Sequence, residues 1–375
     1  MDALTTPSNW QRVRLGDIGK PCMCKRVMKH QTTRYGEIPF YKIGTFGNTA
    51  DAFISKKLFL EYKTKYSFPK KGDILISASG TIGRAVIYDG KPAYFQDSNI
   101  VWIDNDETLV KNDFLFYAYS NVKWNTEHTT ILRLYNDNFR NTLIPLPPLN
   151  EQIAIANILS ALDRYLCALD ALILKKESVK KALSFELLSQ RKRLKGFNQA
   201  WQRVRLGDIC EITTGSLDAN EMVHYGKYRF YTCAKEYYFI DKYAFDTEAI
   251  LISGNGAHVG YVHYYKGKFN AYQRTYVLDN FSEHIIFVKY FLTMFLQSHI
   301  QTNRNEGNTP YIVMATLKDF EILLPPLNEQ IAIANILSAL DNEIASLKNK
   351  KRQFDNIKKA LNHDLMSAKI RVLKK

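Results

Sequence analysis

The sequence Leu146-Pro-Pro-Leu-Asn-Glu-Gln-Ile-Ala-Ile-Ala-Asn-Ile-Leu-Ser-Ala-Leu-Asp163 occurs a second time, letter for letter, at Leu324–Asp341. Identity over these 18 residues shows that the chain contains a duplication. The paired prolines end the preceding element, because proline lacks an N–H and restricts the residue before it. Asn150 is suited to cap a helix, and Glu151 follows where the helix dipole favours negative charge. Each copy therefore predicts the start of a helix.

A shorter repeat marks the start of each half of the chain. Trp10–Ile18 (WQRVRLGDI) returns unchanged as Trp201–Ile209. These openings lie 191 residues apart (10 to 201) and the helix starts 178 apart (146 to 324), so the part before the helix is 13 residues longer in the first half. The order head, helix, head, helix predicts domains at residues 1–145, 146–195, 196–323 and 324–375.

Each head is predicted to be a mixed α/β domain. Short β-branched segments bounded by Gly, Pro or Asn predict strands, and these are Asp73–Ser77, Ala85–Tyr88, Ile100–Ile103, Ala249–Ser253, Gly260–Tyr265 and Tyr272–Leu278. Helical patterns follow near residues 113–120 and 285–300. Alignment of the heads makes Gly80 equivalent to Gly256, and both are expected in turns. The loops differ between the heads, as expected when two copies of a scaffold read different targets.

Apolar residues behind each repeat step by alternating fours and threes, which predicts a coiled-coil seam. The seam includes Leu159, Leu162, Leu166 and Leu169 in the first helix, and Leu337, Leu340, Ile344 and Leu347 in the second. Lysines interrupt both seams, where they either weaken the pairing or fix its register. Helices of about 40 residues would each span about 60 Å. The predicted fold class is α+β, with two mixed α/β domains spaced by an antiparallel two-helix coiled coil of pseudo-two-fold symmetry.

Composition narrows the possible partners and the compartment. The formal charge of +14 at pH 7 favours an anionic partner such as nucleic acid. No apolar run approaches the roughly 18 residues that a membrane span requires, and the N-terminus lacks a signal-peptide layout. The five cysteines match neither a disulfide framework nor a zinc site, so we expect a cytoplasmic protein with reduced thiols.

Taken together, these features resemble the specificity subunit of a type I restriction–modification enzyme. The resemblance rests on the two Trp-x4-Leu-Gly-Asp-Ile openings, the two Pro-Leu-x-Glu-Gln helix starts, the variable heads and the ending at Leu365–Leu373. It implies that each head is a target recognition domain that reads one half of a bipartite sequence in double-stranded DNA. It also implies that the helices set the spacer and hold two methyltransferase subunits, which recruit the restriction and translocase subunits.

Polar loops in the heads supply candidate DNA contacts, because Arg, Asn and Gln side chains match the edges of guanine and adenine. In the first head the candidates are Ser79, Gly80, Thr81, Arg84, Gln96, Ser98 and Asn99. In the second head they are Asn255, His258, Gln273, Arg274, Asn303, Arg304, Asn305 and Asn308. For the partner subunits, identical positions at the helix starts are the candidates, namely Glu151, Gln152, Glu329 and Gln330.

Motifs of catalysis were sought without success. The sequence has no Asn/Asp-Pro-Pro-Tyr/Phe motif for adenine methylation and no phosphate loop with Gly-Lys-Ser/Thr. No cofactor is expected, and His258 and His263 lack a third metal ligand nearby. The favoured function is a non-catalytic DNA-specificity subunit. One alternative is a coiled-coil scaffold whose heads bind protein, and another is a self-sufficient nuclease or methyltransferase.

Overall fold

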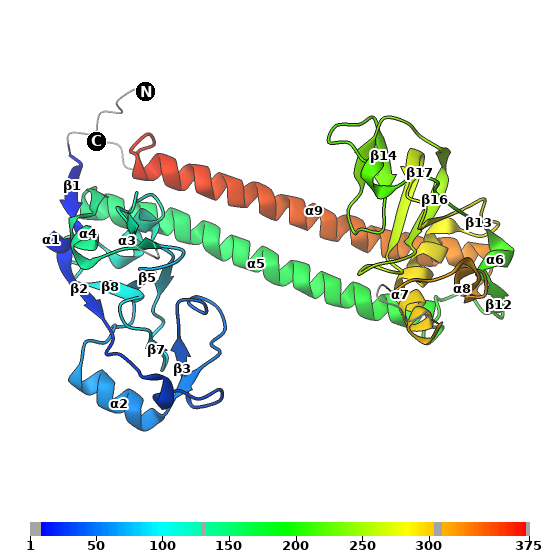
Figure 1. Ribbon diagram of the computed structural model, residues 1–375. Coiled ribbons are helices and arrows are strands. Elements are labelled where there is room, and N and C mark those ends of the chain that lie inside the picture. Colours follow the sequence, from blue (N-terminus) through cyan, green and yellow to red (C-terminus); the bar gives the residue numbers. More distant parts are fainter. Residues whose placement is uncertain (1–8, 129–131, 304–309, 373–375) are drawn as a thin grey trace. The chain divides into compact units, whose positions relative to one another are not determined.

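The computed structural model describes residues 9–128, 132–303 and 310–372. The chain divides into two compact units, one made of residues 1–169 with 350–375 and the other of residues 170–349. Each unit holds one head and a part of each of two long helices, α5 (Leu149–Leu188) and α9 (Leu327–Met366) (Figure 1).

The head of the first unit contains a four-stranded and a three-stranded sheet. The four-stranded sheet has the order β2 (Gly19–Met23), β8 (Ile100–Asn105), β5 (Ile74–Ser77), β6 (Ala85–Ile87), and all its neighbours are antiparallel. The smaller sheet has the order β4 (Phe53–Ile54), β3 (Ile38–Tyr41), β7 (Tyr94–Phe95). Two further antiparallel pairs are β1 (Gln11–Arg14) with β11 (Leu143–Leu146), and β9 (Glu127–His128) with β10 (Leu132–Arg133). Short helices α1 (Leu15–Ile18) and α4 (Asn136–Asn141) complete the frame.

Two hydrophobic clusters fill the first unit, one on each side of its main sheet. Helix α3 (Asn112–Tyr119) packs with the sheet and the long helices, and Phe114 and Leu159 are fully buried there. On the other side, α2 (Lys56–Lys65) covers a cluster rich in aromatic residues that includes Trp102. Because both faces of the sheet are covered, its central strand β5 is apolar throughout except for Ser77, and it is buried throughout.

The second unit contains one continuous six-stranded sheet. Its order is β13 (Glu211–Thr214), β18 (Thr275–Asp279), β16 (Phe245–Ser253), β17 (Val262–Ala271), β14 (Tyr228–Tyr231), β15 (Tyr238–Ile240). Only the β14–β17 pair is parallel. As in the first head, a short antiparallel pair joins the start of the head to its end, here β12 (Gln202–Arg205) with β19 (Glu321–Leu324). Two short helices, α6 (Leu206–Ile209) and α8 (Met314–Lys318), flank this pair.

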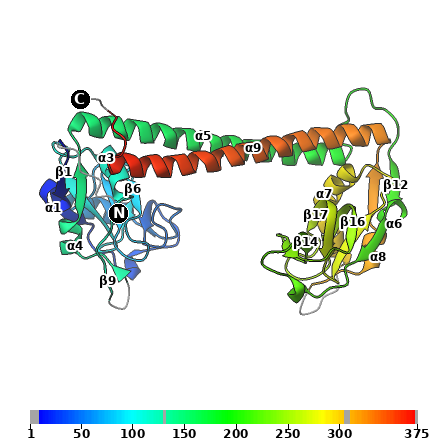
Figure 2. The ribbon, with the colours of Figure 1, turned by 90° about the horizontal axis from the view of Figure 1, so that it is seen from above.

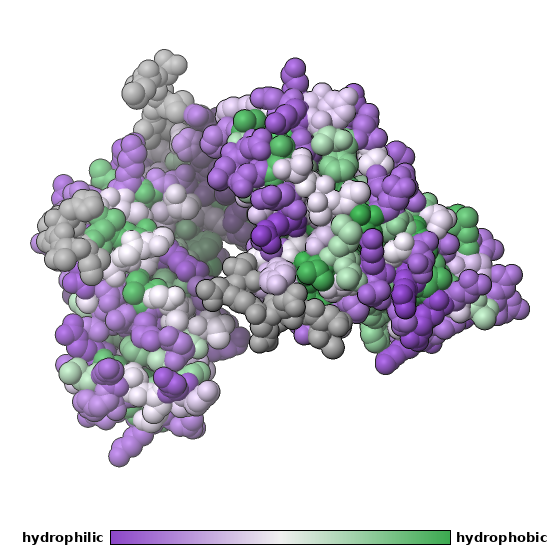
Figure 3. Space-filling view, turned by 45° about the vertical axis from the view of Figure 1, so that its right-hand side comes forward, coloured by the Kyte–Doolittle hydropathy of each residue, from purple (hydrophilic) through white to green (hydrophobic). Residues whose placement is uncertain are grey.

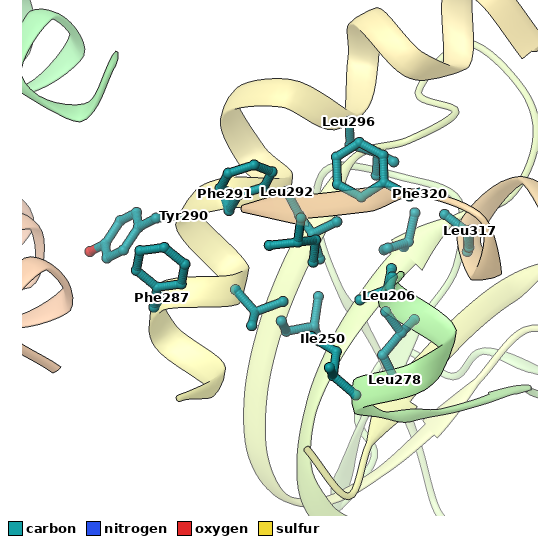
Figure 4. Packing of buried hydrophobic residues seen from close by; sticks show 14 of the residues in the cluster. Leu206, Ile250, Leu278, Phe287, Tyr290, Phe291, Leu292, Leu296, Leu317 and Phe320 are labelled. Carbon is teal, nitrogen blue, oxygen red and sulfur yellow. The ribbon is translucent and has the colours of Figure 1, made fainter. Parts of the chain in front are cut away.

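Helix α7 (Ile285–Asn303) covers one face of the second sheet. Figure 4 shows Phe291, Leu292 and Leu296 of α7 packed toward strand residues of the sheet, while Tyr290 points its hydroxyl away from them. The opposite face carries a cluster of only six buried residues. No helix equivalent to α2 lies within the described residues 232–244, and this difference accounts for most of the extra length of the first head.

The predicted strands and helices of both heads are confirmed, but α2 was not foreseen. The long helices begin at Leu149 and Leu327, one residue before the asparagine that was expected to cap each of them. Inside the first turn, the Asn150 side chain instead accepts a hydrogen bond of 2.9 Å from the N–H of Glu151. The carbonyl of Pro148 accepts from the same N–H at 2.9 Å, so the prolines still mark the helix start.

Within each unit, the two long helices run antiparallel (Figure 2), and three of the seam lysines have partners on the other helix. In the first unit Lys358 pairs with Asp163. In the second unit Lys180 pairs with Asp341, and Lys176 lies 2.8 Å from Glu343. Of the predicted seam residues, Leu159, Leu166, Leu169, Leu337 and Ile344 are buried, while Leu162, Leu340 and Leu347 are half-buried. These ion pairs favour the interpretation that the lysines fix register.

The surface of each unit is mostly hydrophilic on the face shown in Figure 3, where hydrophobic residues lie singly or in small groups. Within residues 9–128, 132–303 and 310–372, no helix is long and apolar enough to cross a membrane. The same residues contain no group of three His, Cys, Asp or Glu side chains that could hold a metal ion.

Candidate nucleic-acid interface

Three segments meet at one end of the main sheet in the first head, and we name residues 77–84, 96–99 and 132–134 the first loop cluster. The N–H of Ala78 donates to the carbonyl of Asn99 at 2.8 Å, and the N–H of Leu134 donates to the carbonyl of Ala78 at 2.9 Å. The turn between β5 and β6 is therefore held between the other two segments. All seven candidates predicted for the first head lie in this cluster.

Side chains inside the first loop cluster hold it together. Ser79, which is 8% exposed, donates to Asn99 Oδ1 at 2.9 Å. Arg133 donates to the same oxygen at 3.1 Å, while Gln96 Oε1 accepts from the N–H of Ile43 at 3.0 Å. These groups support the loops, whereas the exposed members of the predicted set are Gly80, Thr81 and Arg84.

The second head repeats the construction in a second loop cluster, made of residues 253–261, 272–274 and 310–312. The N–H of Gly254 donates to the carbonyl of Arg274 at 2.9 Å, and the N–H of Ile312 donates to the carbonyl of Gly254 at 2.9 Å. Gln273 and Arg274 are exposed, and Asn255 and His258 are half-buried. The structure thus brings these four predicted residues together at one end of the sheet.

The equivalent glycines confirm the alignment of the two clusters. Gly80 has φ +64° and Gly256 has φ +80°, a region that L side chains rarely adopt. Gly80 lies in the turn between β5 and β6, and Gly256 lies in the turn between β16 and β17. The two turns share backbone geometry but expose different side chains, which is the arrangement that two readers of different base sequences require.

Some predicted contacts fall outside what the structure describes, and one basic residue was missed. Arg304, Asn305 and Asn308 lie outside the described residues, and Asn303 is the last residue of α7. Arg133 was not predicted, although its guanidinium also donates to Ser98 Oγ at 3.3 Å. Its signal in the sequence was weak, because the segment around it does not match the corresponding turn of the second head.

The predicted partner residues Glu151 and Glu329 prove to be buried inside their own units. The carboxylate of Glu151 accepts from Trp10 Nε1 at 3.0 Å and from two guanidinium nitrogens of Arg371 at 2.7 and 2.9 Å. Glu329 accepts in the same way from Trp201 at 3.1 Å and from Arg193 at 3.2 and 2.6 Å. Both repeats thus join the start of a head to the start of a long helix.

The neighbouring glutamines are also internal. Gln152 Oε1 accepts from the N–H of Lys111 at 2.8 Å, and its Nε2 donates to the carbonyl of Pro147 at 2.9 Å. Gln330 makes the matching bonds to the N–H of His284 at 3.0 Å and to the carbonyl of Pro325 at 2.8 Å. All four side chains of the two Glu-Gln pairs are at most 2% exposed. The prediction that they contact a partner subunit directly does not fit this burial.

Asp163 and Asp341, the last residues of the repeats, link helix to head. Asp163 accepts from the hydroxyl of Tyr117 at 2.7 Å, and Asp341 accepts from Tyr290 at 2.6 Å. Burial pushes the pKa of Asp341 upward, but hydrogen bonds from Lys180 and Tyr290 hold it below its usual value. Asp341 therefore stays charged although it is partly buried.

The outward face of each repeat is exposed and begins with two apolar residues. Leu149 and Ile153 are 40% and 46% exposed, and their equivalents Leu327 and Ile331 are 52% and 39% exposed. Asn157 and Ala161 continue this face by one residue in each of the next two turns. We name this stripe and its copy in α9 the outer helix faces.

Two heads with matching loop clusters and a shared helical frame define a duplicated, two-headed binding protein. Residues 7–177 and 198–354 each match the family model of the type I restriction modification DNA specificity domain. The chain therefore belongs to this family and carries two copies of its domain.

Individual proteins similar to this chain are also named as type I specificity subunits. A putative type I restriction enzyme specificity subunit from Haemophilus influenzae is 62% identical over 152 residues, which cover 40% of this chain and 40% of that protein. The MjaVIII specificity subunit from Methanocaldococcus jannaschii is 26% identical over 99% of this chain and 95% of its own length. The crystal structure of an S subunit from M. genitalium has a TM-score of 0.67 at 18% identity and covers 96% of this chain and 97% of its own, so the fold is shared.

Proposed function

We propose that the chain is the non-catalytic DNA-specificity subunit of a type I restriction–modification complex, in which each head reads one half of a bipartite site. The observation that carries this proposal is the pair of loop clusters, which share backbone hydrogen bonds but expose different polar side chains. Exposed Arg84, Gln273 and Arg274 have the length and donors to reach base edges in a major groove. Because the substrate would be genomic DNA, we expect the subunit in the cytoplasm.

The proposal extends to two methyltransferase subunits, one on each outer helix face. Protein–protein contacts favour exposed apolar residues at their centre and disfavour charge there. Leu149 with Ile153, and Leu327 with Ile331, offer the same apolar surface twice. Two equal surfaces suit two copies of one partner, which would in turn recruit the restriction and translocase subunits.

The DNA-reading function is tested by selecting duplexes from a random pool with the subunit assembled on its methyltransferase partners. We expect an asymmetric motif of two short blocks separated by a spacer of fixed length. A single continuous motif would contradict the two-head proposal. Undetectable DNA binding even at low salt, where phosphate contacts are strongest, would favour a protein-binding scaffold instead.

The docking proposal has a stoichiometric test. Ile153→Lys and Ile331→Lys should each leave a complex with one methyltransferase copy, and the double variant should bind none, because a charge is placed in an apolar contact. Leu174→Lys is the matched control, since Leu174 is 65% exposed on α5 but lies outside the repeat. Native mass spectrometry counts the copies, and two copies on the double variant would refute this docking surface.

A further inference from the structure

In each loop cluster a glycine ends the turn between two strands. We name residues 77–83 in the first head and 253–260 in the second the recognition turns. The N–H of Gly83 donates to the carbonyl of Ser77 at 2.9 Å, and the N–H of Gly260 donates to Ser253 at 2.7 Å. Their φ angles are +82° and +79°. In each head the glycine lies directly against a side chain from outside the turn, so closely that an added Cβ would overlap it. In the first head that side chain is Trp124, and in the second head Gly260 lies against both Ile300 and Gln297, of which Gln297 is the polar one.

Trp124 and Gln297 lie against equivalent glycines but in different local structure, because Gln297 is within α7 and Trp124 follows the end of α3. Each lies seven residues after the tyrosine that donates to the repeat aspartate, Tyr117 in one case and Tyr290 in the other. In both heads the residue at this spacing therefore lies against the glycine that closes the recognition turn. At this position the duplication has diverged from a large aromatic residue to a polar amide.

The two side chains support their turns by different means. Half-buried Trp124 packs against Tyr119 and Phe139, at ring distances of 5.5 and 6.1 Å, and forms a rigid apolar wall behind Gly83. Gln297 instead donates from Nε2 to the carbonyl of Val259 at 2.8 Å. A cavity of about 380 Å³ lies beside it, lined in part by His258 and Tyr261. The second recognition turn is thus held by the Gln297–Val259 hydrogen bond, at the side of a cavity.

We propose that Trp124 and Gln297 are positioning residues that set the orientation of the recognition turns, and so determine which bases each head selects. Bidentate contacts with a base edge depend on hydrogen-bond distances and angles, so a small rotation of the turn changes which base fits. The second turn is also one residue longer between its closing serine and glycine, and needs a different support. The inference rests on the DNA-reading function proposed above.

The test compares Gln297→Met, which keeps the length but removes the donor, with Gln297→His, which keeps an N–H donor on a different group. In selections with the full complex, Gln297→Met should reduce discrimination at one or more positions of the second block by about tenfold, the scale of one lost bidentate contact. The first block should stay unchanged. Gln297→His should restore the wild-type preference, which a direct base contact by the amide would not allow.

Variants of Trp124 in the first head provide an independent test. Trp124→Leu should alter only the first block, and Trp124→Phe should preserve it. Thr293→Ala, on the exposed side of α7, is the control and should alter neither block. Thermal unfolding of each variant identifies any that fail to fold.

Three outcomes would overturn the inference. Equal weakening of both blocks with unchanged base preferences would make the two residues merely structural. Unchanged preference and affinity in folded Gln297→Met and Trp124→Leu would show that they have no role. Loss of preference in Gln297→His as well as in Gln297→Met would make Gln297 a direct reader. A wild-type complex that selects no bipartite motif would instead refute the proposed function itself.

Discussion

Arg371 forms a two-point ion pair with Glu151, a residue 220 positions earlier in the chain. Arg193 forms the same pair with Glu329 in the other unit. In each unit, the segment that leaves one long helix thus anchors the start of the other helix. The tryptophans of the shorter repeat, Trp10 and Trp201, donate to the same carboxylates. Two repeats that looked independent in the sequence therefore form one structural joint, which is built twice.

Removing the arginine from such a joint should destabilise its unit strongly. Among the described residues, Arg193→Ala leaves the fully buried Glu329 carboxylate with Trp201 as its one side-chain donor, which is expected to cost about 3 kcal/mol in the free energy of unfolding. Arg371→Ala should act in the same direction on the first unit. Urea denaturation measures the change, and hydrogen exchange assigns it to a unit.

The control for this prediction is Arg203→Ala. Arg203 pairs with Glu321 at 2.8 Å, but both side chains are more than half exposed, so the loss should stay below about 1 kcal/mol. Equal losses of stability in Arg193→Ala and Arg203→Ala would show that the buried ion pair stabilises the fold no more than an exposed one.

The seam should be equally sensitive in its two copies. Leu159 and Leu337 are both fully buried and occupy the same place in the repeat. Replacing either with alanine leaves a cavity, and we expect a loss of about 2–5 kcal/mol from the unit concerned. Leu174→Ala is the control, because its side chain is 65% exposed and should change stability by less than about 0.5 kcal/mol. A small effect of Leu159→Ala in urea denaturation would mean that the helices are not held by this seam.

Acid should weaken the second unit through His263. Burial lowers the pKa of His263 below its usual 6.5, and its Nε2 lies 2.9 Å from the carbonyl of Ala234. The unfolded chain therefore binds a proton more readily than the folded unit, and stability should fall as pH drops below about 6.5. His263→Gln should flatten this dependence in denaturation curves recorded between pH 7.5 and about 5. An unchanged slope would assign the proton uptake to other groups, such as His284, whose pKa burial also lowers.

The helix starts and strands could be predicted because their signals are local. Prolines determine where each long helix begins, and a row of leucines and isoleucines determines which side it buries. The role of Glu151 could not be read in this way. Its partners, Trp10 and Arg371, come from opposite ends of the chain, so an internal joint was predicted to be a contact site for a partner subunit. Helix α2 was missed although Ser55 caps it by accepting from the N–H of Leu58 at 3.2 Å.

The grouping of the candidate residues into loops could be predicted from the sequence, but the exposure of each side chain could not. The polar loops near the turn glycines could be located because the strands that carry them were recognised. Which side chains face outward depends on tertiary hydrogen bonds. Ser79 and Asn99 turn inward to each other, whereas Arg274 stays exposed. A sequence pattern contains no signal for that choice.

The exposed arginine of the second loop cluster should read only one block of the motif. Arg274→Ala is expected to weaken binding to the selected site by about 1–3 kcal/mol and to relax the second block, while the first block stays the same. Lys57→Ala, which removes an exposed charge from α2, is the control for loss of charge alone. Titrations of matched and mismatched duplexes measure both effects. Uniform weakening across all duplexes would make Arg274 a phosphate contact rather than a base reader.

The long helices should act as a ruler for the spacer. Inserting one heptad after Leu169 in α5 and another after Asn349 in α9 keeps the seam in phase, because seven residues restore the same face of each helix. Each helix gains about 10 Å, equal to about three base pairs of DNA, and the selected spacer should lengthen accordingly. Insertion into α5 alone is the matched control. It shifts that helix against α9, so that the Lys358–Asp163 and Lys180–Asp341 pairs cannot both form, and the variant should be less stable. If the double insertion folds and assembles but selects the original spacer, the distance between the half-sites is set elsewhere.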